Sequence, residues 1–221
     1  MGLDLSARLS APDELVQALY VAYYGRAADP AGRAFWADAQ TSRTGDGQAP
    51  ETALSGIASA FADTAESLTT YPFLAAPQDS DAANFVGAVF EQAFDRAPDG
   101  AADDPTTGLG FWTQRITDQL RDGEPIGTSV LDILQGAQGT DRTTLLNKIA
   151  AADGFTARTV AGDHAYDTPA ARDVVDAIGA GVSRDAARAA GAEAVPVVSV
   201  AVSIADDPAL AETASALGDA A

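Results

Sequence analysis

The chain contains no cysteine, and among its 221 residues it has only one histidine. Without cysteine, thiol catalysis, disulfide bonds and thiolate metal ligands are excluded. A Ser-His-Asp triad would have to use His164, and no nucleophile motif accompanies that residue. No glycine-rich phosphate loop follows an expected strand either. We therefore expect that the protein is not an enzyme.

Basic residues are also scarce, since 13 lysines and arginines stand against 32 acidic residues for a net charge of -19. Binding to nucleic acid or to an anionic membrane surface needs clustered basic side chains, so neither partner is expected. No apolar run approaches the length of a transmembrane segment. The N-terminus lacks a basic region followed by an apolar one, so no cleavable signal peptide is predicted, and export would need another route.

Alanine-rich segments with clear start signals fill most of the chain and favour helices. Ser10, Asp29-Pro30, Thr168-Pro169 and Asp207-Pro208 are typical helix starts, because an oxygen-bearing side chain precedes the first turn. The sequence therefore predicts an all-α, multi-helix bundle. The expected helices lie near 12–24, 30–42, 51–70, 80–95, 107–122, 126–136, 141–159, 169–180, 184–192 and 208–217.

The C-terminal part differs in composition from the rest. All 15 aromatic residues lie at or before Tyr166, and an Ala/Val-rich segment follows. The valines of 194–205 favour a strand by propensity, but Pro196 and the lack of a partner strand oppose it. We expect a buried helix there, within a C-terminal helical extension or connector over 161–221.

The stretch LYVAYYGRAADPAGRAFWADA has a second copy in VFEQAFDRAPDGAADDPTTGLGFWTQRI, which carries six extra residues between Asp99 and Gly108. Each copy reads as a helix, an arginine-containing turn and a second helix with Phe-Trp, so the sequence predicts two repeated helix-turn-helix units, 1–76 and 77–160. The matched pairs are Tyr20 and Phe90, Tyr24 and Phe94, Arg26 and Arg96, Asp29 and Asp99, Gly32 and Gly108, Phe35 and Phe111, and Trp36 and Trp112.

Two interpretations of this unit are open. In the first it is a structural corner, in which Arg26 pairs with Asp29 across the turn and the aromatic residues Tyr20, Tyr24, Phe35 and Trp36 form core. In the second it is a shallow sugar-binding surface, because aromatic faces with polar tips suit carbohydrate. The ligand-binding candidates are then Tyr23, Arg26, Arg33 and Arg96, with Tyr23 as the expected exposed aromatic.

The acidic loop of the second copy contains Asp95, Asp99, Asp103 and Asp104, with Gly100 for a sharp turn. Hard oxygen ligands of this kind suit calcium, so these four carboxylates are the candidate metal ligands. Their spacing is not that of an EF-hand, and a solvated acidic loop is the alternative.

The two copies and the segment 133–155 together carry a resemblance. Tyr24-Gly25-Arg26, Asp29-Pro30, Gly32 and Phe35-Trp36, with their second-copy counterparts, resemble a family of bacterial helical domains of unknown function. These domains recur in type I-secreted, haemolysin-type surface proteins, and the chain is also similar to the N-terminal anchoring region of alphaproteobacterial S-layer proteins over roughly residues 12–160.

The resemblance implies an extracellular module on the bacterial cell surface. It implies a non-catalytic role, anchoring an S-layer or secreted surface protein to lipopolysaccharide O-antigen polysaccharide. The alternative is a structural subunit of an extracellular lattice or filament, in which the chain self-associates by helix–helix contacts. The calcium repeats and secretion tail found in such proteins do not occur in this sequence.

Overall fold

The computed structural model describes residues 12–162 and 164–196, and within them every regular element is helical. The all-α prediction is therefore confirmed for this part of the chain. Its α-helices are α2 (Pro12–Tyr24), α3 (Pro30–Gly45), α4 (Pro50–Ala62), α5 (Ala65–Thr70), α6 (Ala82–Phe94), α7 (Gly108–Asp122), α8 (Gly127–Gly136), α9 (Gly139–Ala161), α10 (Thr168–Asp176) and α11 (Arg184–Glu193), and two short 3-10 helices, η1 (Pro72–Ala75) and η2 (Asp79–Asp81), precede α6.

Most expected helix boundaries agree with the structure to within a few residues. The single helix expected over 51–70 is wrong, because the chain breaks at Asp63 and the Thr64 side chain accepts a hydrogen bond from the Ser67 N–H to start α5. Asp29 caps α3 as predicted, whereas the cap of α10 is Asp167 instead of Thr168.

The helix expected over 194–205 is wrong at its start, because α11 ends at Glu193 and residues 194–196 are not helical. The rest of that segment lies outside the described residues, as does the helix expected over 208–217.

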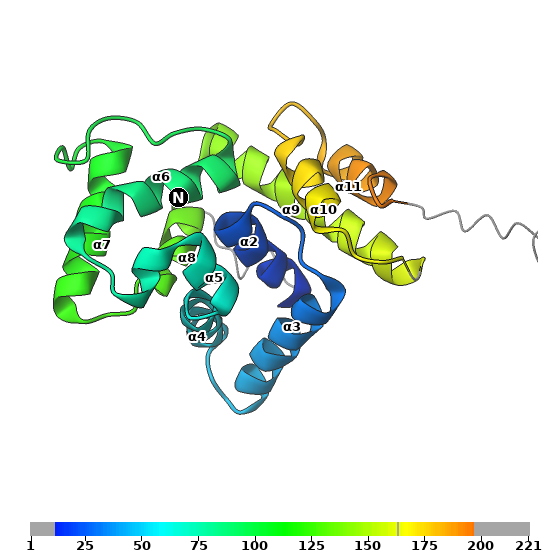
Figure 1. Cartoon of the computed structure of the whole chain (residues 1–221), viewed down its shortest axis with the longest axis horizontal. Helices are drawn as coiled ribbons and strands as arrows, with labels where there is room; N and C mark the ends of the chain where they lie inside the picture. The colour runs from blue at the N-terminus through cyan, green and yellow to red at the C-terminus, as the bar shows by residue number, and fades with distance from the viewer. Residues whose placement is uncertain (1–11, 163, 197–221) are drawn as a thin grey trace, which may run out of the picture.

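Helix α2 lies at the centre of the molecule, and neighbouring helices cover it on several sides (Figure 1). It packs against α3, α6, α8 and α9, and every residue from Leu15 to Tyr24 is buried. A helix that is covered all round needs side chains that tolerate burial on every face, which explains the leucines, valines, alanines and tyrosines of this segment. The one polar residue among them, Gln17, donates hydrogen bonds to the Ala152 carbonyl and the Thr156 hydroxyl.

In chain order, the helices from α2 to α9 form two sets of four, α2–α5 and α6–α9. Two of the position-matched pairs pack against one another, since α2 contacts α6 and α4 contacts α8. One hydrophobic cluster extends through both sets and includes residues from Leu15 to Val195.

Helices α10 and α11 pack on the long helix α9 (Figure 1). Gly154 of α9 faces the backbone of α11, and Gly191 of α11 faces the backbone of α9 at Ala151. A Cβ atom at either position would overlap backbone of the other helix, so the two glycines permit this close approach.

Phe61 of α4 is the aromatic centre of the first set of helices. Its side chain is 1% exposed, and its ring packs against those of Tyr20, Tyr24 and Trp36. We expect Phe61→Ala to lower the free energy of unfolding by about 3–5 kcal/mol in chemical denaturation, because it leaves a cavity in the core. The matched control Phe35→Ala removes a ring that is 64% exposed and should change stability by only about 0.5 kcal/mol. Equal losses in the two variants would contradict this account of the core.

Candidate functional site: two arginine corners

The first corner, residues 20–36, is organised around the buried guanidinium of Arg26. Its Nε and Nη2 atoms donate to the Glu66 carboxylate at 2.7–3.0 Å, and its Nη1 donates to the Ala27 carbonyl at 3.0 Å and the Tyr166 hydroxyl at 2.8 Å. These bonds match the five N–H donors of an arginine. Arg26 is therefore a structural residue that joins the end of α2 to α5 and to the segment before α10.

The predicted bridge between Arg26 and Asp29 is only a long contact of 4.0 Å. Asp29 instead caps α3, because its carboxylate accepts a hydrogen bond from the Gly32 N–H at 2.7 Å. The main partner of Arg26 is Glu66, 40 residues away, which the sequence analysis missed. The sequence feature that could have indicated Glu66 is its place in the first turn of α5, directly after the N-cap Thr64 and Ala65.

Aromatic rings surround this ion pair. The Arg26 Cζ lies 4.9 Å, 5.4 Å and 5.8 Å from the ring centroids of Tyr20, Tyr24 and Tyr166, within the range of cation–π attraction. Burial on its own lowers the pKa of Arg26, but the hydrogen bonds to Glu66 and the neighbouring charges outweigh it and raise that pKa. The guanidinium thus stays charged in an apolar setting because its partners are fixed around it.

The core assignment of the first corner is confirmed for Tyr20, Tyr24 and Trp36, the last of which is partly buried against the core. It is wrong for Phe35, whose side chain is 64% exposed. Neighbouring residues on a helix point in different directions, so when Trp36 turns inward towards Phe61, Phe35 turns to solvent.

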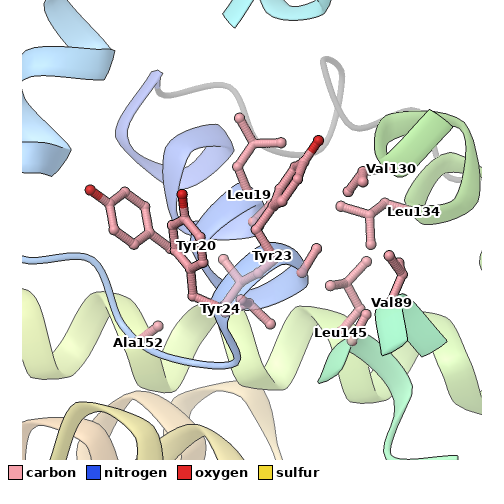
Figure 2. Packing of buried hydrophobic residues seen from close by; sticks show 14 of the residues in the cluster. Leu19, Tyr20, Tyr23, Tyr24, Val89, Val130, Leu134, Leu145 and Ala152 are labelled. Carbon is pink, nitrogen blue, oxygen red and sulfur yellow. The ribbon is translucent and has the colours of Figure 1, made fainter. Parts of the chain in front are cut away.

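The prediction that Tyr23 is an exposed aromatic is also wrong. Its side chain is 0% exposed, and its hydroxyl donates to the Gly127 carbonyl at 3.2 Å. Figure 2 shows that it lies towards Val130 and Leu134, and its ring also packs against that of Tyr24, with the two centroids 6.1 Å apart. Because α8 covers this side of α2, Tyr23 is part of the core and has no access to a ligand.

Arg33 is engaged in ion pairs rather than presented to solvent. Its Nη2 lies 2.7 Å from Asp153 of α9 and 3.2 Å from Asp13 of α2, and its side chain is 16% exposed. Asp153 also pairs with Arg188 of α11. These ion pairs tie together the helices at this end of the bundle, which gives Arg33 a clear structural role.

The second corner, residues 90–112, has the same local geometry around Arg96. Its Nε and Nη2 donate to the Asp141 carboxylate at 2.8 and 2.7 Å, and its Nη1 donates to the next carbonyl, that of Ala97, at 3.0 Å. The Arg96 Cζ lies 5.2 Å from the Phe90 ring centroid, as Arg26 lies over Tyr20. Unlike Arg26, the Arg96 side chain is 41% exposed.

The turn and the Phe-Trp pair also match between the corners. The residue before each arginine, Gly25 or Asp95, has a left-handed backbone with a φ of 58°. The Phe35 and Trp36 rings are 5.0 Å apart at an interplanar angle of 77°, and the rings of the second pair are 5.0 Å apart at 80°. Phe111, the counterpart of Phe35, is likewise exposed, at 50%.

The left-handed turn at Asp95 is held by the only lysine of the chain. Asp95 pairs with Lys148, which is 1% exposed and also donates to the Gln92 carbonyl at 2.9 Å. Glycine adopts this backbone more readily than aspartate, so the ion pair offsets the less favourable residue. The sequence analysis missed Lys148 as a partner, although a lone buried lysine needs one.

The four candidate calcium ligands do not converge. Asp95 forms the ion pair described above, and Asp99 accepts a hydrogen bond from the Gly108 N–H at 3.4 Å. Asp104 accepts hydrogen bonds from the Thr106 N–H and hydroxyl at 3.0 and 2.6 Å. The hydrogen bonds from Thr106 hold the pKa of Asp104 below its usual value. Asp103 is exposed. Across residues 12–162 and 164–196 no group of three or more such side chains could hold a metal ion, so calcium stays a prediction.

Comparison with known proteins gives no relative for this chain. No protein-family model, no curated protein and no solved structure matches it. Among the described helices, none combines the length and the apolar character needed to cross a membrane. Function is therefore inferred from the chemistry of the two corners and of the surface beside them.

Burial of the tyrosines predicts a dependence of stability on alkaline pH. Burial raises the pKa of Tyr71 to about 12 and raises the pKa values of Tyr20, Tyr23, Tyr24 and Tyr166 as well, so all five tyrosines are affected. An unfolded tyrosine ionises near pH 10 while a folded one keeps its proton, so the folded state binds more protons above that pH. The contribution of the protonated tyrosines to the free energy of unfolding is therefore fully present below pH 10. It is lost above that pH, by about 1.4 kcal/mol per pH unit for Tyr23 alone.

Tyrosinate absorbance and helical circular dichroism, followed together from pH 8 upward, check this expectation. We expect little tyrosinate near pH 10 and a joint rise of tyrosinate and loss of helix above it. A folded protein whose tyrosines titrate near pH 10 would contradict the burial of these rings.

Proposed function

We propose that the protein is a non-catalytic module of the bacterial cell surface that binds polysaccharide and so anchors a surface protein to lipopolysaccharide O-antigen. Support comes from the repeated corner, from two exposed aromatic rings and from a polar groove beside one of them. The resemblance of the corner motifs to secreted surface proteins supports the extracellular location.

The matched geometry of the two corners supports a duplicated unit. Arg26 and Arg96 each hold a carboxylate in the first turn of a later helix, Glu66 in α5 and Asp141 in α9. The packing of α2 on α6 and of α4 on α8 is what two copies related by an approximate twofold rotation would produce. On this proposal the repeats are residues 1–76 and 77–160, and 161–221 is the extension.

The exposed phenylalanines carry the functional proposal. Phe35 and Phe111 occupy matched positions on α3 and α7, each stacked edge-on against a partly buried tryptophan, and they are 64% and 50% exposed. An exposed ring held by a rigid neighbour offers an apolar face at little entropic cost, which suits the C–H face of a sugar. Two such rings in one chain suit a repetitive polymer, because linked sites raise the effective affinity.

A groove beside Phe111 has the polar groups that carbohydrate needs. It encloses about 360 Å³ and is lined by Phe111, by the amides of Gln114 and Gln119, and by charged side chains that include Arg115 and Asp118. Amides donate and accept the hydrogen bonds of sugar hydroxyls and carboxylates accept them, while the ring contacts the apolar face. The net charge of -19 favours a neutral glycan over an acidic one.

The alternative is a structural subunit of an extracellular lattice or filament, in which the chain self-associates through its exposed apolar side chains. The exposed Phe35 also favours this role, since an apolar ring on a helix surface can pack against another helix. The two functions differ in what the rings contact, glycan in one and a second copy of the chain in the other.

Titration of purified lipopolysaccharide O-antigen into the protein by calorimetry tests the proposal. We expect binding by the wild type and at least roughly tenfold weaker binding by Phe111→Ala, a loss of about 1.4 kcal/mol. The matched control is Val182→Ala, which removes an exposed apolar side chain from the loop before α11 and should leave the affinity unchanged.

Sedimentation of the same samples decides between the two functions. No binding of O-antigen, together with assemblies that Phe35→Ala disrupts, would overturn the anchoring role in favour of the structural one. A monomer that binds glycan would exclude the lattice subunit.

A further inference from the structure

The two corners differ in what lies between their aromatic rings, a phenylalanine in the first and a pocket in the second. Along α4 and along α8, buried residues occur with the spacing i, i+3, i+4 and i+7, and the last position is Phe61 in one set and Ala137 in the other. Phe61 lies in the last turn of α4, whereas Ala137 is the extended residue that directly follows α8. The two buried sets are Leu54, Ile57, Ala58 and Phe61 in the first, and Val130, Ile133, Leu134 and Ala137 in the second.

The missing ring leaves a pocket in the second corner. In the first corner Phe61 fills the space between Tyr20, Tyr24 and Trp36, with ring centroids 5.1–5.2 Å apart. Their counterparts Phe90, Phe94 and Trp112 instead line a pocket of about 180 Å³, together with Ala137, Arg96 and Asp141. We call this the Trp112 pocket.

The arginine of this pocket also has hydrogen-bonding capacity to spare. Arg26 uses all five donors, one of them on Tyr166, and its side chain is 6% exposed. Arg96 makes three hydrogen bonds within the described part of the chain, which leaves two N–H donors there, and its side chain is 41% exposed. The second corner thus has the architecture of the first without the two groups that close it, a phenylalanine ring and a tyrosine hydroxyl.

We infer that the Trp112 pocket binds a single neutral pyranose ring, in a subsite separate from the groove beside Phe111. A cavity of about 150 Å³ is known to hold one six-membered ring, so a pocket of about 180 Å³ is of the right size for one ring. Three aromatic side chains provide apolar faces for the C–H side of the sugar. Arg96, Asp99 and Asp141 on its wall provide donors and acceptors for the hydroxyls, which a purely aromatic ligand would leave unpaired.

Sugar as the ligand class rests on the proposed function, whereas the pocket itself rests only on the comparison of the two corners. The surplus of 19 negative charges disfavours acidic sugars. Within a polysaccharide, one residue would enter the Trp112 pocket while the chain runs across the surface. The Trp112 pocket then determines which sugar is bound, and the exposed rings of Phe35 and Phe111 increase the affinity for the polysaccharide.

The indole N–H signals of Trp112 and Trp36 in NMR spectra provide a built-in comparison, since each lies at the same position of its corner. Glucose, galactose, mannose and N-acetylglucosamine are titrated one at a time into the full chain. We expect at least one of them to shift the Trp112 signal in a saturable manner and to leave Trp36 unchanged. Equal shifts at both tryptophans, or none at Trp112 with any sugar, would overturn the inference.

The variant Ala137→Phe tests the pocket by closing it as Phe61 closes the first corner. Ala137 has a φ of -60° and a ψ of 132°, a backbone that phenylalanine adopts readily. We expect a melting temperature at or above that of the wild type and at least roughly tenfold weaker sugar binding. Arg96→Lys is the second variant. Lysine keeps the positive charge but lacks the planar guanidinium with its several N–H donors, so this variant should weaken sugar binding. It tests the pocket independently if Ala137→Phe does not fold.

O-antigen titrated into the same proteins separates failure of this inference from failure of the proposed function. Wild-type binding to O-antigen with no hexose effect at Trp112, or unchanged sugar affinity in the folded variants, overturns the pocket and leaves the anchoring function. A hexose effect at Trp112 with no binding to O-antigen supports the pocket and overturns the anchoring function.

Discussion

The ion pair between Arg26 and Glu66 is the interaction on which the rest of the first corner depends. A guanidinium that is 6% exposed keeps its charge only if nearly all its donors are bonded, and Glu66, Ala27 and Tyr166 supply those bonds. Through them the end of α2 is fixed to α5 and to the segment before α10. Because α2 contacts most of the other helices, fixing its end orients the bundle around it.

The second corner has similar geometry around its arginine but lacks the phenylalanine ring and the tyrosine hydroxyl that enclose Arg26. Arg96 keeps its bidentate carboxylate and the carbonyl of the next residue, and the turn before it keeps its left-handed backbone. A pocket lined by Ala137 lies between the aromatic rings of this corner, and Arg96 on its wall makes only three hydrogen bonds within the described residues.

Local signals in the sequence predicted the helices well, because caps such as Asp29 and the turn before Pro30 act over a few residues. Properties set by distant helices could not be predicted. Tyr23 is buried because α8 covers it, and Phe35 is exposed because no helix of the described residues covers it. The pairing of Arg26 with Glu66 joins residues 40 positions apart, and no spacing rule within the corner indicates it.

Hydrogen exchange of the two arginine Nε–H groups, measured by NMR, tests most directly whether the first corner is closed and the second open. Both groups donate to carboxylates, so they differ mainly in how the surrounding residues enclose them. We expect Arg26 to exchange on the order of a hundredfold more slowly than Arg96, because its release requires local unfolding around Phe61 and Tyr166. Equal exchange rates at Arg26 and Arg96 would contradict the account.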